Sequence, residues 1–188
     1  MQKLKMDSKK MKVYKKGNKY QMVKISGEAV EADKTESFTT SGNYTWTPPA
    51  GIVGTTIQYE VAGAGGGSGE TEMAWGNGGN GDRKIGSMSI STTPIEVIIG
   101  KGGESYSDAE YAEGDNGGKS SFGNIKALGG GGGYAEWEDG ADGSDAGNGQ
   151  GGKGAGKPPL YLSNGQDGWV KITYTVLEQQ DTYKAFEE

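Results

Sequence analysis

Glycine dominates the stretch Gly63–Gly156, which holds 30 of the 37 glycines of this 188-residue chain. Its last part, Asp139–Gly156, reads DGADGSDAGNGQGGKGAG, and every third residue from Gly140 to Ala155 is glycine or alanine. Three residues per turn is the period of the polyproline II helix, and a column without large side chains lets neighbouring backbones pack against it. We therefore expect packed glycine helices in place of an ordinary side-chain core.

Collagen and a flexible linker are the two other structures that such a stretch could form. Collagen requires glycine at every third position and abundant proline, whereas Asp139–Gly156 contains no proline. A glycine linker would be a random coil and stays open as an alternative. Strand-like segments interrupt the glycine blocks, and this alternation favours an ordered structure.

Six segments outside the glycine blocks are rich in β-formers, and several alternate apolar with polar residues as half-buried strands do. They are 44–47, 56–62, 86–91, 95–99, 122–128 and 169–176. The sequence therefore predicts a mainly β protein without large helical content. Its fold would be a small antiparallel β-sandwich or jelly-roll-like frame that carries polyglycine II-like loops.

The first 24 residues are basic, with nine lysines against Asp7 alone, a net charge of +8. The formal net charge of the chain is −6, so the remaining residues carry −14. Phosphate would be repelled by this acidic body, so we expect no nucleic-acid partner. The basic arm would either dock on an acidic protein surface or merely keep the chain soluble.

Within this arm, short strands at 12–14 and 20–25 flank a Gly-Asn turn and predict a hairpin. A lone hairpin is marginal in water, so we expect residues 1–25 to form an anchor that folds against a partner. A linker over 26–37, a glycine-rich domain over 38–176 and a helical or frayed tail over 177–188 would follow. The predicted anchor residues are Lys9, Lys10, Lys12, Tyr14, Lys15, Lys16 and Tyr20.

Catalytic and cofactor motifs are weak in this chain, which has no histidine and no cysteine. The G-x-G-x-x-G matches at 76–81 and 149–154 open no helical pattern, and Pro158 stands where the hydroxyl of a P-loop should follow Lys157. Paired carboxylates of a carbohydrate depolymerase remain a minor alternative. We therefore expect a protein that is not an enzyme and holds no cofactor. No apolar run is long enough to span a bilayer, so we expect no membrane insertion.

Five blocks occur in an order that resembles a known family: FTTSGNYTWTPPAG, YEVAGAGGGSG, IEVIIGKGGE, GGKSSFGNIKALGGGGG and GQDGWVKITY. They are similar to the glycine-rich domain of bacteriophage fibre and other virion proteins, and they span nearly all of 38–176. The glycine packing is also similar to that of the polyglycine-helix adhesins of T-even-like tail fibres. The resemblance implies a β-framework with glycine-rich loops, displayed on the exposed surface of a virion and attached to a capsid or tail protein.

Three insertions between glycine blocks place aromatic residues among acids, at 70–75, 104–113 and 134–139. Rigid aromatics at loop tips bury a large area at low entropic cost, so they suit recognition surfaces. We expect them to bind a saccharide or protein of a host surface, although they could instead cover the glycine bundle or form a homo-oligomer interface, for which a trimer is the expectation. The candidates are Trp75, Tyr106, Tyr111, Tyr134 and Trp137.

Asp139, Asp142 and Asp145 would share one face of a polyproline-type helix and are weak Ca²⁺ candidates, because Ca²⁺ prefers oxygen ligands. A solvated acidic edge is the simpler interpretation, and we expect no metal. The functional hypothesis is a non-enzymatic virion attachment or decoration protein, in the head or in a tail fibre. A bacterial glycine-rich surface or matrix protein is the alternative.

Overall fold

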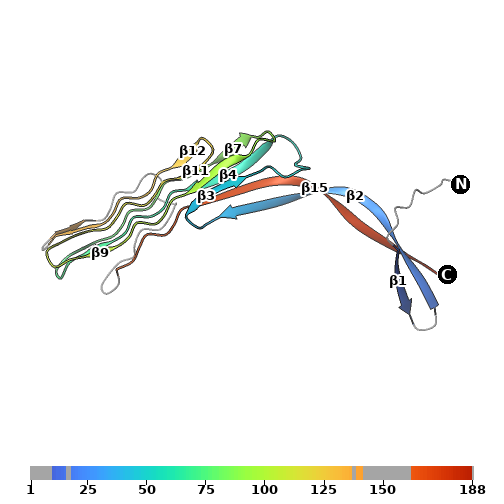
Figure 1. Ribbon diagram of the computed structural model, residues 1–188, viewed down its shortest axis with the longest axis horizontal. Coiled ribbons are helices and arrows are strands. Elements are labelled where there is room, and N and C mark those ends of the chain that lie inside the picture. Colours follow the sequence, from blue (N-terminus) through green and yellow to red (C-terminus); the bar gives the residue numbers. More distant parts are fainter. Residues whose placement is uncertain (1–9, 16–17, 137–138, 142–161, 188) are drawn as a thin grey trace.

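The computed structural model describes residues 10–15, 18–136, 139–141 and 162–187, and its described part is mainly β, without any helix. Figure 1 shows an elongated molecule with three parts. A β-frame lies in the middle, wavy glycine-rich segments extend from one of its ends, and a long ribbon of paired strands extends from the other.

The β-frame consists of two antiparallel sheets. The strands of the first sheet, in the order β1-β2-β15-β4-β7, are β1 (Lys10–Lys15), β2 (Asn18–Phe38), β15 (Trp169–Glu187), β4 (Thr56–Ala62) and β7 (Arg83–Ser89). Those of the second sheet, in the order β12-β11-β8-β3, are β12 (Ile125–Ala127), β11 (Ser120–Phe122), β8 (Ile95–Ile99) and β3 (Gly42–Trp46). This arrangement is the small β-sandwich-like fold that the sequence predicts.

A single hydrophobic cluster lies between these two sheets. Trp46 of β3 and Phe122 of β11 meet Ile57 of β4 and Ile172 of β15, and all four side chains are at most 2% exposed. Alternation places the core residues, because successive side chains of a strand point to opposite faces. Val61, Val97, Ile99, Ala127, Val170 and Tyr174 complete the buried set.

Two predictions are wrong for the ribbon, which is formed by the paired strands β2 and β15 where they extend beyond the frame. Residues 26–37, predicted as a linker, lie in β2, where they pair with β15, and residues 177–187, predicted as a helical or frayed tail, continue β15 antiparallel to β2. Both segments are polar, and residues 29–37 and 177–179 are mostly exposed, so the usual apolar face is missing. Cross-strand contacts replace it: Thr175 donates to Asp33 over 2.8 Å, and Lys34 pairs with Glu178 at 2.5 Å.

The predicted hairpin of the basic arm is present, since β1 pairs with the start of β2 from Lys10 opposite Val23 to Lys15 opposite Asn18. It lies at the far end of the ribbon (Figure 1). Lys10, Lys12, Tyr14 and Lys15 stand on β1 and Tyr20 on β2, whereas Lys9 and Lys16 fall outside the described residues. Whether this hairpin is an anchor stays a prediction.

In the described part of the chain, six extended segments form the glycine bundle and run out from the frame and back: 63–68, 76–82, 100–106, 114–118, 128–133 and 163–168. Segment 63–68 lies among the other five. Its N–H groups donate in turn to 82, 118 and 166, and then to 79, 115 and 163, so the same three neighbours recur every three residues. The N–H groups of Gly130 and Gly103 donate back to its carbonyls at 64 and 65. This is the hydrogen bonding expected of packed polyproline-type helices, which have no internal bonds.

Close backbone approach explains why the bundle is made of glycine. A Cβ added to Gly132 would lie 1.7 Å from the carbonyl oxygen of Gly114, and one added to Gly66 would lie 1.9 Å from that of Gly131. Nothing but a hydrogen atom fits at these positions. The period-three column of 139–156, from which the packing was first predicted, lies mostly outside the described residues; the described segments carry the evidence.

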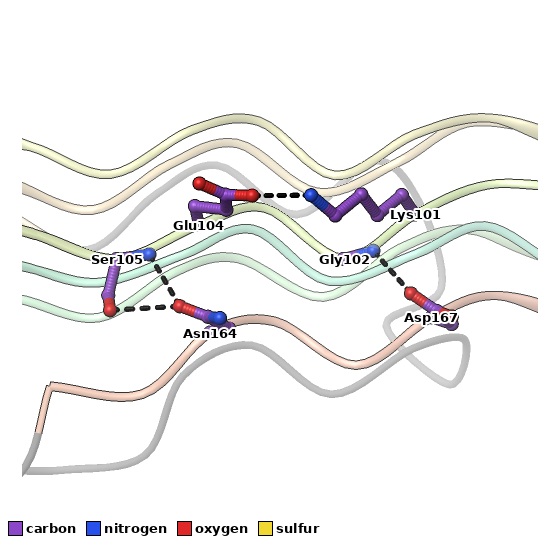
Figure 2. Close-up of polar contacts among 6 residues, drawn as sticks. All are labelled: Lys101, Gly102, Glu104, Ser105, Asn164 and Asp167. Atoms are coloured by element: carbon purple, nitrogen blue, oxygen red, sulfur yellow. Dashed lines mark hydrogen bonds and ion pairs between the residues drawn. The ribbon is translucent and has the colours of Figure 1, made fainter.

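Side chains of segment 163–168 accept hydrogen bonds from N–H groups of neighbouring segments (Figure 2). Asp167 accepts from the N–H of Gly102 over 2.8 Å and from that of Ser41 over 2.9 Å. Asn164 accepts from the N–H and the hydroxyl of Ser105, over 2.8 and 2.9 Å. Because Ser41 precedes β3, Asp167 ties the bundle to the frame.

We expect Asp167→Asn to destabilise the protein by about 1–3 kcal/mol at neutral pH, because its amide nitrogen cannot accept the second backbone N–H. Burial raises the pKa of Asp167, but the hydrogen bonds from Gly102 and Ser41 outweigh it and lower that pKa below its usual value. The stabilisation is therefore present above the unfolded-state pKa of about 3.9 and is lost as the pH falls through the lower folded-state pKa.

Thermal unfolding of both proteins between pH 2 and pH 7 tests this expectation. The two melting temperatures should converge toward the acid end, since protonated Asp167 has lost the charge that the variant lacks. A gap that stays constant over the whole range would contradict the role of the carboxylate.

Candidate functional site at the tip of the glycine bundle

The far end of the bundle, which we call the tip, carries two further three-stranded sheets. The first has the order β10-β13-β14, with β10 (Tyr111–Glu113), β13 (Tyr134–Glu136) and β14 (Asp139–Ala141). The second has the order β6-β5-β9, with β6 (Trp75–Gly76), β5 (Gly69–Glu70) and β9 (Tyr106–Ser107). The glycine segments thus end in a second, smaller β-structure.

A small alanine core holds the tip together. Ala112 of β10 and Ala135 of β13 are fully buried and directly opposite each other, and they form one cluster with Ala74. A tight turn precedes β6, because Thr71 both donates its N–H to the carbonyl of Ala74 over 2.8 Å and accepts the N–H of Ala74 over 3.0 Å at its hydroxyl. Small buried residues let the sheets approach while larger neighbours face outward.

Four of the five predicted recognition residues gather at this tip. Trp75, Tyr106 and Tyr111 have exposed fractions of 50%, 52% and 49%, and Tyr134 is half-buried against Tyr111. Trp137 lies outside the described residues. Trp75 and Tyr106 belong to one sheet and the tyrosine pair to the other. Whether these side chains bind a ligand stays a prediction.

The tyrosine pair has a defined geometry. The rings of Tyr111 and Tyr134 are 5.3 Å apart between centroids and nearly perpendicular, at 76°. Each hydroxyl donates to the glutamate two residues later: Tyr111 to Glu113 over 2.8 Å, and Tyr134 to Glu136. These hydrogen bonds raise the pKa of Tyr111 and raise the pKa of Tyr134 to about 12, so both phenols stay neutral hydrogen-bond donors at physiological pH.

Sequence reasoning missed Glu113, Glu136 and the exposed Met73, which is 64% exposed beside Trp75. The signal for the two glutamates is a repeated tripeptide, since Tyr-Ala-Glu occurs at 111–113 and again at 134–136. In a strand the middle residue points away from its two neighbours. The repeat therefore encodes two matching strands, each with a buried alanine between a tyrosine and an exposed glutamate; Tyr111 is exposed and Tyr134 is half-buried.

Other predicted motifs carry no site in the described structure. The glycine motif at 76–81 runs as an extended segment into β7 instead of opening a helix, and the match at 149–154 lies outside the described residues. Asp139 stands on β14, while Asp142 and Asp145 are outside the described residues. Within the described ranges, no three histidine, cysteine or acidic residues cluster as metal ligands, and no helix has the length and hydropathy to cross a membrane.

Comparison with curated proteins gave no match for this chain. A family model does match. The model for the glycine-rich domain covers residues 39–175, which include the frame strands from β3 onward, the glycine bundle and the tip. That range is well over half of the sequence, so the chain belongs to the glycine-rich domain family.

Proposed function

We propose that this chain is a non-enzymatic attachment protein displayed on the surface of a bacteriophage particle. Its basic hairpin docks on a capsid or tail protein, and its tip binds a saccharide or protein of the host surface. The observation that carries the proposal is the gathering of half-exposed Trp75, Tyr106 and Tyr111 at the end of the bundle opposite the ribbon.

The exposure of these side chains supports recognition over packing. A residue that merely covered the bundle would bury its ring against glycine backbone, yet about half of the surface of each of these residues is exposed. Aromatic side chains are enriched where binding energy concentrates in interfaces. Three exposed aromatic side chains on the two small sheets of the tip therefore favour a recognition role.

The elongated shape supports a division of labour between the two ends. The hairpin and the tip lie at opposite ends of the molecule, with the β-frame between them (Figure 1). The basic arm has the charge to dock on an acidic surface, and the long ribbon holds it away from the frame. The resemblance to virion proteins supports a capsid or tail protein as the partner that offers this acidic surface. Attachment proteins of this kind are commonly symmetric oligomers, and a trimer is the expected assembly.

A triple tip variant tests the proposal. Trp75→Ala/Tyr106→Ala/Tyr111→Ala should reduce binding of the fluorescently labelled full-length protein to intact bacterial cells at least about tenfold, because truncating one hot-spot residue, a class enriched in Trp and Tyr, costs about 2 kcal/mol or more. Binding is measured by flow cytometry over a panel of strains. The melting temperature should change little, since all three side chains are half exposed.

The matched control removes three comparably exposed apolar side chains that lie outside the tip. Ile85, Leu128 and Leu177 are 64%, 56% and 54% exposed, and their joint replacement by alanine should leave cell binding unchanged. Equal binding by the tip variant and the wild type, or no binding of the wild type to any strain, would overturn the proposal.

A further inference from the structure

The outer face of the β10-β13-β14 sheet has an alternating pattern of tyrosine and glutamate. Tyr111 lies opposite Glu136, and Glu113 lies opposite Tyr134, so each aromatic ring has a carboxylate both across the ladder and along its own strand. The alanines between them point to the other face and are buried. All four polar side chains therefore stand on one face of the β10-β13 strand pair.

The tyrosine hydroxyl protons of this face are already donated in hydrogen bonds, whereas the carboxylates use only part of their capacity to accept. Each tyrosine donates its only hydroxyl proton to a glutamate. An ionised carboxylate has about four acceptor positions, so Glu113 and Glu136 keep acceptors free in exposed positions. These four residues thus offer aromatic ring surface and hydrogen-bond acceptors, and neither tyrosine hydroxyl keeps a proton to donate elsewhere.

Charge at the tip is one-sided. Residues 68–75, 104–115, 134–136 and 139–141 include nine aspartates and glutamates and no lysine or arginine. Among the described residues of these ranges, Glu104 pairs with a cation, Lys101, which lies in the neighbouring glycine segment. Ring faces are themselves negative, because the quadrupole of an aromatic ring attracts cations. The carboxylates and the aromatic rings of the tip therefore both favour a cationic ligand.

Resting on the proposed function of the tip as a recognition surface, we propose that this face binds a lysine side chain in a basic segment of the partner protein. The alkyl stem of the lysine lies along the exposed ring of Tyr111 and the half-buried ring of Tyr134, and its ammonium group donates to Glu113 and Glu136. An ammonium group has three donors and no acceptor, which complements a face whose glutamates keep free acceptors and whose tyrosine hydroxyl protons are already donated.

Other ligands fit this face less well. A neutral saccharide would cover the two carboxylates without neutralising them, and covering an unpaired charge is costly. A quaternary ammonium group has no N–H to donate, so the free acceptors of the glutamates would stay unpaired. The lysine side chain satisfies both the rings and the carboxylates.

The test uses a penta-lysine peptide, acetylated at its N-terminus alone so that its side-chain ammonium groups stay intact. The peptide is titrated into the full-length protein by isothermal calorimetry. Glu113→Gln/Glu136→Gln should weaken binding at least about tenfold, the equivalent of 1.4 kcal/mol, and added salt should weaken binding to the wild type. Both glutamates are exposed, so the variant should melt like the wild type. The matched control, Glu72→Gln/Glu110→Gln, removes the same charge from other exposed positions of the tip and should bind nearly as tightly as the wild type.

Three results would overturn the inference: no binding of penta-lysine, equal loss in the two double variants, which would indicate unspecific attraction to the acidic tip, or binding of an oligomer of glucosamine in preference to penta-lysine. These results are distinguishable from failure of the proposed function. If the triple tip variant loses cell binding while Glu113→Gln/Glu136→Gln does not lose penta-lysine binding, the tip is a recognition surface with a different ligand.

Discussion

Gly66→Ala should disrupt the glycine bundle and destabilise the protein by at least about 4 kcal/mol, a loss that single substitutions seldom reach. The new Cβ would lie 1.9 Å from the carbonyl oxygen of Gly131 and 2.5 Å from its carbon. Backbone cannot move aside as a flexible side chain can. Segment 63–68 must therefore shift, and its hydrogen bonds to the surrounding segments break together.

Urea denaturation followed by circular dichroism measures the loss, and hydrogen exchange at the amides of residues 63–68 locates it. Gly54→Ala is the control: a Cβ there would meet nothing within 4 Å, but its φ of +78° is unfavourable for alanine. A left-handed conformation costs about 1–2 kcal/mol, so the control should lose only that amount. A Gly66→Ala variant no less stable than the control would show that the bundle is not close-packed.

Trp46→Ala should cost about 3–5 kcal/mol, the usual range for removing a large aromatic side chain from a core. Trp46 is 2% exposed and packs against Phe122 and Tyr174, with ring centroids 5.8 and 5.9 Å away. These three rings join β3, β11 and β15, so the cavity would open between the two sheets of the frame.

Trp46→Phe is the informative companion. The indole N–H of Trp46 is buried, and no described residue accepts a hydrogen bond from it. A buried donor without a partner costs about 1–3 kcal/mol, and phenylalanine removes that donor while keeping an aromatic ring. We expect Trp46→Phe to lower the free energy of unfolding, measured by urea denaturation, by less than half as much as Trp46→Ala does. Equal losses would mean that the size of the indole alone decides the stability.

Strand positions in the frame could be predicted where alternation is strong. The predicted segments 56–62 and 95–99 coincide with β4 and β8. The predicted strand 122–128 is wrong in one respect, because Gly123 has a φ of +55° and turns the chain, so that Phe122 of β11 pairs with Ile125 of β12. The Gly-Asn pair at 123–124 is a hairpin signal, but the apolar residues on both sides concealed it.

The ribbon could not be predicted from hydrophobic periodicity. Residues 26–37 and 177–187 have few apolar side chains, because two paired strands outside the frame have no core to face. Their pairing is set by backbone hydrogen bonds and cross-strand contacts between residues more than 130 positions apart. Such long-range pairing leaves little trace in a local stretch of sequence.

The glycine bundle and the tip were predictable in kind but not in arrangement. Glycine blocks between strands indicate packed backbones, yet glycine carries no side chain that would tell which segment neighbours which, so the central position of 63–68 comes from the structure alone. At the tip, aromatic residues among acids marked Trp75, Tyr106, Tyr111 and Tyr134. The pairing of the last two required the register of β10 and β13.

The threefold order of donors from segment 63–68 limits how a protein of this kind can change its reach. One added residue would turn every later N–H of the segment by a third of a turn. Each N–H would then point to a different neighbouring segment and lose its carbonyl acceptor. Three added residues would restore the direction and lengthen a segment by about 9 Å, at 3.1 Å per residue. Natural or engineered variation in length should therefore come in triplets, inserted in all the bundled segments together, so that the tip moves outward in steps.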